Sequence, residues 1–269
     1  MTVSILGCGW FGMSLAKLLL AQNITVKAST TTQSKLAHLK AAGTEAFLVN
    51  IQSPANSIID PVFFDCDTLV IANNVKMASQ EEHLIRAEHT LSLIRRHAIK
   101  KVVFISSTSV YGDPNSIVNE KTVPSPESVS GKILCAAERL FQNDNSFACT
   151  ILRFAGLVGP GRDPGKFFAG KTNVPNGGAP VNLVHLDDCT SITQTIITAP
   201  AVVPVLNVVT PDHPVRSEFY TLATEKAGLT APTFLSEKNS WKIVESTVSI
   251  PGGYRYKISD WMKWLQETN

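Results

Sequence analysis

Short apolar runs alternate with longer amphipathic segments along the first two thirds of the chain. The apolar runs are rich in β-branched residues, which is typical of buried strands. The longer segments repeat apolar residues every three or four positions, which is typical of helices. We predict strands at residues 2–6, 24–28, 46–50, 68–72, 101–106 and 149–153, and helices at residues 13–21, 34–42, 80–97 and 131–142.

This alternation of strands and helices predicts a parallel sheet covered by helices on both faces. The fold class we expect is α/β, a Rossmann-type doubly wound parallel sheet with a small C-terminal α+β substrate lobe. After residue 155 a glycine- and proline-rich loop, residues 156–180, could cover a ligand, and a helix and a late strand follow at 187–198 and 205–209. The predicted dinucleotide-binding domain comprises residues 1–155 and 183–210, and the substrate lobe comprises residues 156–182 and 211–269.

The strongest local signal is a glycine turn directly after the first strand. Residues 7–12 have the form G-x-G-x-x-G, between a predicted strand and a predicted helix, which is the context that this motif requires. Gly7 allows the tight turn, Gly9 lets the backbone approach a pyrophosphate, and Gly12 lets the helix pack against the strand. The free N–H groups of the first helical turn then face the anion. We assign these residues to the cofactor site: Gly7, Gly9, Trp10, Phe11 and Gly12.

The end of the second strand bears on which dinucleotide binds. NAD sites usually carry an acidic residue about twenty residues after the glycine turn, bound to the ribose 2′-hydroxyl. Here the strand ends in Ser29, Thr30 and Thr31, followed by Lys35, with no acid. Hydroxyls, backbone amides and a lysine suit a 2′-phosphate, so NADP is the favoured cofactor and NAD is the alternative. The ends of neighbouring strands complete the predicted cofactor site: Asn50, Ile51, Ala72, Asn73 and Asn74.

Three later motifs point to a family. Residues 104–112 read F-I-S-S-T-S-V-Y-G, residues 151–162 read I-L-R-F-A-G-L-V-G-P-G-R, and residues 182–188 read N-L-V-H-L-D-D. Together they resemble the extended short-chain dehydrogenase/reductase superfamily, the NAD-dependent epimerase/dehydratase group that acts mostly on nucleotide sugars. The resemblance covers nearly the whole chain. The glycine turn departs from the extended pattern G-x-x-G-x-x-G and has the form found in atypical members.

The resemblance implies chemistry that this chain supports only in part. The family moves a proton with a tyrosine, whose pKa is lowered by a lysine four residues later, while hydride passes to or from the cofactor. Ser107 matches the family serine that orients the reacting oxygen. Glu138 matches a glutamate that follows the family lysine by four residues, which places Leu134 at the lysine position and Ser130 at the tyrosine position. Lys132 is about 200° around the helix from the lysine position and does not replace it.

Other side chains could supply the missing acid or base, or bind the substrate. Tyr111 follows the strand that carries Ser107, and we predict these two as catalytic residues, with a packed structural tyrosine as the alternative for Tyr111. Arg162 and Arg216 could bind substrate phosphates as planar forks, or could form surface ion pairs. His185 is a third candidate for the substrate site, with a structural histidine as its alternative.

The composition of the chain argues against several kinds of partner and binding site. The net charge of +2 and the absence of a lysine/arginine run argue against nucleic acid as a partner. No cysteine pair has metal-ligand spacing among the 5 cysteines, so we expect reduced thiols and no metal site. The N-terminus lacks the pattern of a signal peptide, and no apolar run reaches the roughly 18 residues of a membrane span. We therefore expect a cytoplasmic protein that does not bind membranes.

Three hypotheses for function remain open. The first is an NAD(P)-dependent epimerase, dehydratase or reductase that acts on a nucleotide sugar or similar polar compound with a replaced acid/base. The second is a catalytically silent NADP-binding sensor or regulatory protein. The third is a flavin or other dinucleotide enzyme that shares only the glycine turn. The substrate is not identified by any motif in residues 211–269, and the oligomeric state is left open, with a homodimer as one alternative.

Overall fold

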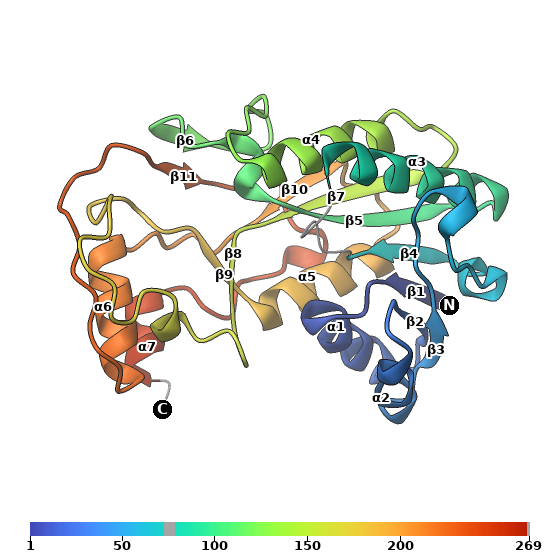
Figure 1. Ribbon diagram of the computed structural model, residues 1–269, viewed down its shortest axis with the longest axis horizontal. Helices are drawn as coiled ribbons and strands as arrows, with labels where there is room; N and C mark the ends of the chain where they lie inside the picture. The colour runs from blue at the N-terminus through green and yellow to red at the C-terminus, as the bar shows by residue number, and fades with distance from the viewer. Residues whose placement is uncertain (73–78, 268–269) are drawn as a thin grey trace.

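The computed structural model in Figure 1 describes residues 1–72 and 79–267. Its central sheet has seven parallel strands in the order β10-β7-β5-β4-β1-β2-β3. Because β1 lies inside the sheet and later strands are added on both sides of it, the sheet is doubly wound. This confirms the predicted Rossmann-type α/β fold. The strands are β1 Thr2–Leu6, β2 Thr25–Thr30, β3 Glu45–Leu48, β4 Thr68–Ile71, β5 Lys101–Ser107, β7 Ala148–Phe154 and β10 Val205–Val208.

Helices cover both faces of this sheet. In Figure 1, α3 and α4 lie above it, and α1, α2 and α5 lie below it. Burial on both faces explains why the central strands are continuous apolar runs: Val3, Ile5 and Val70 are fully buried. No helix in the described parts of the chain is long and apolar enough to cross a bilayer. The helices are α1 Trp10–Leu20, α2 Leu36–Ala41, α3 Gln80–Arg96, α4 Val129–Gln142 and α5 Leu186–Thr198.

A second, smaller cluster of elements lies beside the carboxyl ends of the strands (Figure 1). It contains α6 (Arg216–Lys226) and α7 (Trp261–Glu267), and two short parallel pairs, β8 with β9 and β6 with β11. The segment that we predicted as a loop, 156–180, is in fact partly ordered into β8. These are the bounds of the short strands: β6 Ser116–Val118, β8 Gly156–Val158, β9 Leu183–His185 and β11 Lys242–Val244. The hydrophobic core of this smaller cluster of elements consists of Val158, Val181, Leu183, Phe219, Tyr220, Ala223, Trp261 and Leu265.

A buried ion pair fastens α4 to the sheet. Nη2 of Arg153, on β7, donates to Oε2 of Glu138, on α4, at 2.6 Å, and its Nε lies 3.1 and 3.2 Å from the two carboxylate oxygens. The two side chains are only 4% and 2% exposed. Ser106 donates a further hydrogen bond to Glu138, at 2.5 Å, and Nη1 of Arg153 donates to the Tyr111 hydroxyl at 2.7 Å. The hydroxyl in turn donates to Asn207 on β10, at 2.9 Å, so the network spans three strands and a helix.

The Glu120 carboxylate connects the edge strand β10 to the C-terminal segment. It accepts hydrogen bonds from the amides of Asn207 and Thr247, both at 2.9 Å, and from the Ser246 hydroxyl at 2.7 Å. Burial alone would raise the pKa of this carboxyl, but the hydrogen bonds outweigh burial and lower the pKa below its usual value. The charged form of Glu120 is therefore the form that stabilises the fold.

We expect Glu138→Gln to lower the free energy of unfolding by about 3–5 kcal/mol, because it leaves the Arg153 guanidinium buried without its counter-charge. Urea denaturation at neutral pH measures this change. Glu88→Gln, which alters an exposed glutamate on α3, is the matched control and should change stability by less than about 0.5 kcal/mol. Equal effects of the two substitutions would contradict a structural role for the buried pair.

The lowered pKa of Glu120 makes its contribution to stability dependent on pH. Because the folded pKa lies below the unfolded one, the contribution is fully present above the unfolded value and is lost as the pH falls through the folded value. We therefore expect Glu120→Gln to be less stable than the wild type at pH 7, and the difference to shrink below about pH 4. Urea denaturation of both proteins across this range tests the prediction, and a constant difference at all pH values would contradict it.

Candidate dinucleotide-binding site

The glycine turn joins β1 to α1 at the carboxyl edge of the sheet. Gly7 has a φ of 91°, a left-handed conformation that glycine adopts without steric cost. The helix that follows the turn begins at Trp10, and not at residue 13 as predicted. Two hydrogen bonds hold the turn against β2. The Gly7 amide donates to Oγ of Ser29, and the Cys8 amide donates to the Ser29 carbonyl, both at 2.9 Å. Ser29, which we assigned to the cofactor, therefore also positions the turn.

The two remaining glycines of the turn differ in what surrounds them. A Cβ on Gly12 would lie 3.0 Å from the Gly7 carbonyl oxygen and 3.2 Å from Cγ2 of Ile5, so only glycine lets α1 pack this close to β1. A Cβ on Gly9 would meet nothing within 4 Å. The surrounding protein atoms leave room for a side chain at position 9, whereas a ligand that approaches the backbone there would not.

A cleft of about 630 Å³ opens beside the turn, which is a volume typical of cofactor sites. Most of the predicted cofactor residues line it, and they are Gly7, Gly9, Ser29, Thr30, Thr31, Lys35, Asn50, Ile51 and Ala72. Trp10, Phe11 and Gly12 begin α1 and are not among its described lining residues. Asn73 and Asn74, also predicted, lie outside the described residues.

One wall of the cleft comes from α3 and was not predicted. His83, Arg86, Ala87 and Thr90 line it, at the spacing of one helix face. This spacing was visible in the sequence, but nothing in the sequence indicated that this face of α3 lines one cleft with the ends of β2 and β3. The described lining residues include two cationic side chains, Lys35 and Arg86, and no carboxylate. An anionic ligand therefore meets complementary charge here.

The inner end of the cleft is apolar. Its lining there comes from β4, β5 and α4, and consists of Ile71, Phe104, Ile133, Leu134, Ala137 and Phe141. Leu134, which the family resemblance places at the lysine position, thus faces the cleft with an uncharged side chain. Ser130, which the family resemblance places at the tyrosine position, is exposed on the first turn of α4, where its hydroxyl lies 3.3 Å from that of Ser128. The Lys132 side chain is exposed and is not among the described lining residues.

The two predicted catalytic residues lie at the end of β5, but in different surroundings. Ser107 is half-buried, and its hydroxyl oxygen accepts a hydrogen bond from the Ser109 amide at 3.2 Å. Tyr111 is 2% exposed, and its hydroxyl both accepts from Arg153 and donates to Asn207. Burial raises the pKa of this phenol. The contacts of Tyr111 are those of a structural side chain, and it is not among the described residues that line the cleft.

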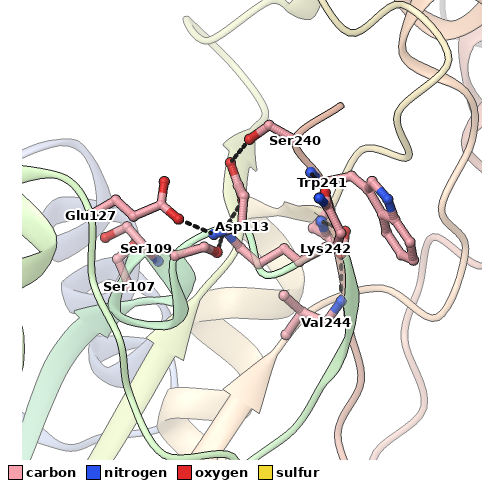
Figure 2. A network of polar contacts seen from close by, with 11 residues as sticks. Ser107, Ser109, Asp113, Glu127, Ser240, Trp241, Lys242 and Val244 are labelled. Atoms are coloured by element: carbon pink, nitrogen blue, oxygen red, sulfur yellow. Dashed lines mark hydrogen bonds and ion pairs between the residues drawn. The ribbon is translucent and has the colours of Figure 1, made fainter. Parts of the chain in front are cut away.

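A polar network covers the turn that follows Ser107 (Figure 2). Lys242 donates through Nζ to the Gly112 carbonyl and to the Asp113 carboxylate, both at 2.7 Å. The Asp113 amide donates to Glu127, and Ser240 donates to the Asp113 carboxylate. These contacts join the segment before α4 to β11, a strand that is distant in sequence. They hold the segment of Gly112 and Asp113, which follows the turn after Ser107.

The predicted substrate residues do not gather at one place. Arg162 stacks on the Trp10 ring, 4.4 Å from its centroid, and the Trp10 indole donates to the Pro160 carbonyl at 2.6 Å. The loop that carries Arg162 thus contacts the glycine turn. Arg216 is instead at the start of α6, where it donates to the Pro175 carbonyl at 3.3 Å.

His185 lines a second cavity of about 480 Å³, between the 159–164 loop, α6 and α7. Its Nδ1 accepts a hydrogen bond from the Asp187 amide at 3.2 Å, which caps α5 and assigns the ring proton of the neutral form to Nε2. Burial lowers the pKa of this imidazole, although the neighbouring carboxylates oppose the shift. The lowered pKa favours the neutral imidazole of His185, and its Nδ1 has a structural role.

The cysteines are free thiols, and no group of three or more His, Cys, Asp or Glu within residues 1–72 and 79–267 could hold a metal ion. Cys8 lines the cleft within the glycine turn. Burial raises its pKa to about 12, so the thiol stays neutral. It is neither a thiolate nucleophile nor a charge that would repel phosphate.

The similarity of this chain to known proteins agrees with a dinucleotide-binding cleft beside the glycine turn. A family model described as NAD(P)H-binding matches residues 7–182. Protein YeeZ of Escherichia coli (strain K12) is 36% identical over 265 residues, which cover 96% of each chain. MoeE5 in complex with UDP-glucuronic acid and NAD has a TM-score of 0.78 at 19% identity, covering 98% of this chain and 99% of that one. The UDP-glucose 4-epimerase of Thermus thermophilus in complex with NAD has a TM-score of 0.76 at 18% identity, covering 97% and 96%.

We expect Gly9→Val to keep the wild-type melting temperature within about 2 °C but to weaken binding of NADPH at least tenfold, because a Cβ there meets no protein atom within 4 Å and the side chain would block a pyrophosphate bound along the turn. Calorimetric melting and fluorescence titration measure the two effects. Gly12→Val is the comparison variant, and it should lower the melting temperature itself, since its Cβ would press on Gly7 and Ile5. Unchanged NADPH affinity in Gly9→Val would contradict the assignment of the turn.

Proposed function

The chain belongs to the NAD(P)H-binding family, and on that premise we propose that it binds NADP(H) in the cleft between the glycine turn and α3. The observation that carries the proposal is the open space at Gly9 next to a cleft whose described lining has two cations and no carboxylate. A pyrophosphate would lie along the turn, and Thr31 and Lys35 would face the ribose. NADP(H) supplies hydride chemistry when bound.

The proposed role of the bound cofactor is regulatory or sensory and not catalytic. The family relay needs a tyrosine hydroxyl and a lysine beside the nicotinamide, and the resemblance places Ser130 and Leu134 at those positions. Leu134 is 8% exposed, in the apolar inner end of the cleft, where it cannot lower the pKa of a neighbouring hydroxyl. Tyr111 is held by Arg153 and Asn207 and does not replace the relay. These contacts favour a protein that binds the cofactor without turning it over.

A second candidate function is supported by a different observation. The chain has the fold of MoeE5 and of the Thermus epimerase over nearly its whole length, and these proteins are described with UDP-glucuronic acid and NAD and with NAD, respectively. Ser107 retains the family serine at the end of β5, half-buried. On this basis the protein would be an epimerase, dehydratase or reductase of a nucleotide sugar or similar polar compound, using an acid/base other than the family tyrosine.

We expect NADPH to raise the melting temperature, by mass action on the native state, and to be neither oxidised nor exchanged in the presence of a panel of UDP- and dTDP-sugars. Thermal melting with and without NADPH measures binding, and transfer of deuterium from labelled NADPH, followed by mass spectrometry, measures turnover. Gly9→Val serves as the control that should lose the thermal shift.

Two results would contradict this proposal in different ways. If neither NADPH nor NADH shifted the melting temperature, the proposal of dinucleotide binding would be refuted. Deuterium transfer to any sugar nucleotide would replace the silent function by the enzymatic one. In that case Ser107→Ala should abolish the transfer and leave NADPH binding unchanged.

A further inference from the structure

The loop after β2 leaves the recognition of a 2′-phosphate incomplete. Ser29 is 1% exposed and binds the glycine turn, and the Thr30 hydroxyl accepts a hydrogen bond from the Thr32 amide at 3.1 Å. Two of the hydroxyls are therefore already engaged within the protein. Lys35 is the one cation of this loop, and it is exposed. A second positive group would strengthen the binding of a dianionic phosphate at this place, and residues 29–35 contain no arginine.

An arginine reaches the same cleft from α3. Arg86 is half-buried and lines the cleft together with Thr31 and Lys35. Its place on the helix is fixed at the N-terminus by a capping box, in which Ser79 and Glu82 exchange hydrogen bonds. Among the described residues, no hydrogen bond or ion pair holds the Arg86 guanidinium, so its five N–H donors are available for a ligand.

Contacts one turn further along α3 show which part of the cleft Arg86 faces. His89 lies 3.0 Å from the Gln52 carbonyl and 3.1 Å from the Ser57 hydroxyl through Nδ1, which attaches the helix to the loop after β3. That loop begins beside the end of β2, because Thr30 pairs with Leu48 and its carbonyl accepts from the Val49 amide. Arg86, three residues before His89 on α3, lines the same cleft as Thr30, at the end of β2, and Asn50, just after β3.

We propose that Arg86 binds the ribose 2′-phosphate of NADP(H) from the α3 wall, opposite Lys35, and makes the site selective for NADP(H) over NAD(H). The inference rests on the proposed dinucleotide binding. A guanidinium fork can donate two parallel hydrogen bonds to a phosphate, which an ammonium cannot. The described lining residues include no carboxylate that would neutralise the two cations or accept a hydrogen bond from an unphosphorylated 2′-hydroxyl.

The experiment compares the dissociation constants of NADPH and NADH, by fluorescence titration, for the wild type and four variants. We expect the wild type to bind NADPH more tightly than NADH. Arg86→Ala should raise the Kd of NADPH about tenfold to a hundredfold and change that of NADH less than about threefold, since the lost hydrogen bonds are charge-assisted. Lys35→Ala should have the same direction of effect, and Arg86→Lys, which keeps the charge but loses the fork, should fall between.

The matched control is Arg96→Ala, which removes an exposed arginine from the end of the same helix and should leave both constants unchanged. Equal loss of NADPH and NADH affinity in Arg86→Ala would overturn the inference and place Arg86 against the adenine or pyrophosphate. Unchanged NADPH affinity would also overturn it. A wild type that binds neither nucleotide would refute the proposed function itself, and one that binds both equally would refute only the selectivity.

Discussion

Arg153 carries a positive charge into the interior of the sheet, and the surrounding structure is arranged to neutralise it. Glu138, on α4, forms an ion pair with the guanidinium, and the Tyr111 hydroxyl accepts a hydrogen bond from its Nη1. An unpaired charge at this depth would cost several kcal/mol, so α4, β5 and β7 have one relative position that is acceptable. That position brings Leu134, four residues before Glu138 on α4, to the inner end of the cleft.

In this arrangement residues that are close together have different roles, because some hold the fold together and others line the cleft. Tyr111 follows the strand of Ser107, yet its hydroxyl belongs to the buried network, which continues through Asn207 to the β10 edge. The same asparagine receives support from Glu120, which also holds the C-terminal segment. The Rossmann-type fold is thus combined with a cleft whose outer part is cationic and whose inner part is apolar.

Much of the fold followed from local patterns. Parallel central strands are buried on both faces, so their apolar runs were recognisable. The glycines of residues 7–12 marked the turn, because Gly7 has a left-handed φ and Gly12 packs closely against β1. The short strands β6, β8, β9 and β11 were not predicted, since three-residue strands carry no readable period. The hydrogen bond by which Ser29 positions the glycine turn and the burial of Tyr111 could not be predicted either, because both depend on partners that are distant in the chain.

The sequence by itself determined the sheet, the glycine turn and the absence of an acid after β2. It also contained Ser130 and Leu134 where the family resemblance expects tyrosine and lysine. The tertiary structure alone decided that Arg86 shares a cleft with Lys35, and that Tyr111 is occupied by Arg153. The reason is physical: strand and helix patterns record how a segment is buried, but which charged side chains face one cavity depends on how distant segments pack.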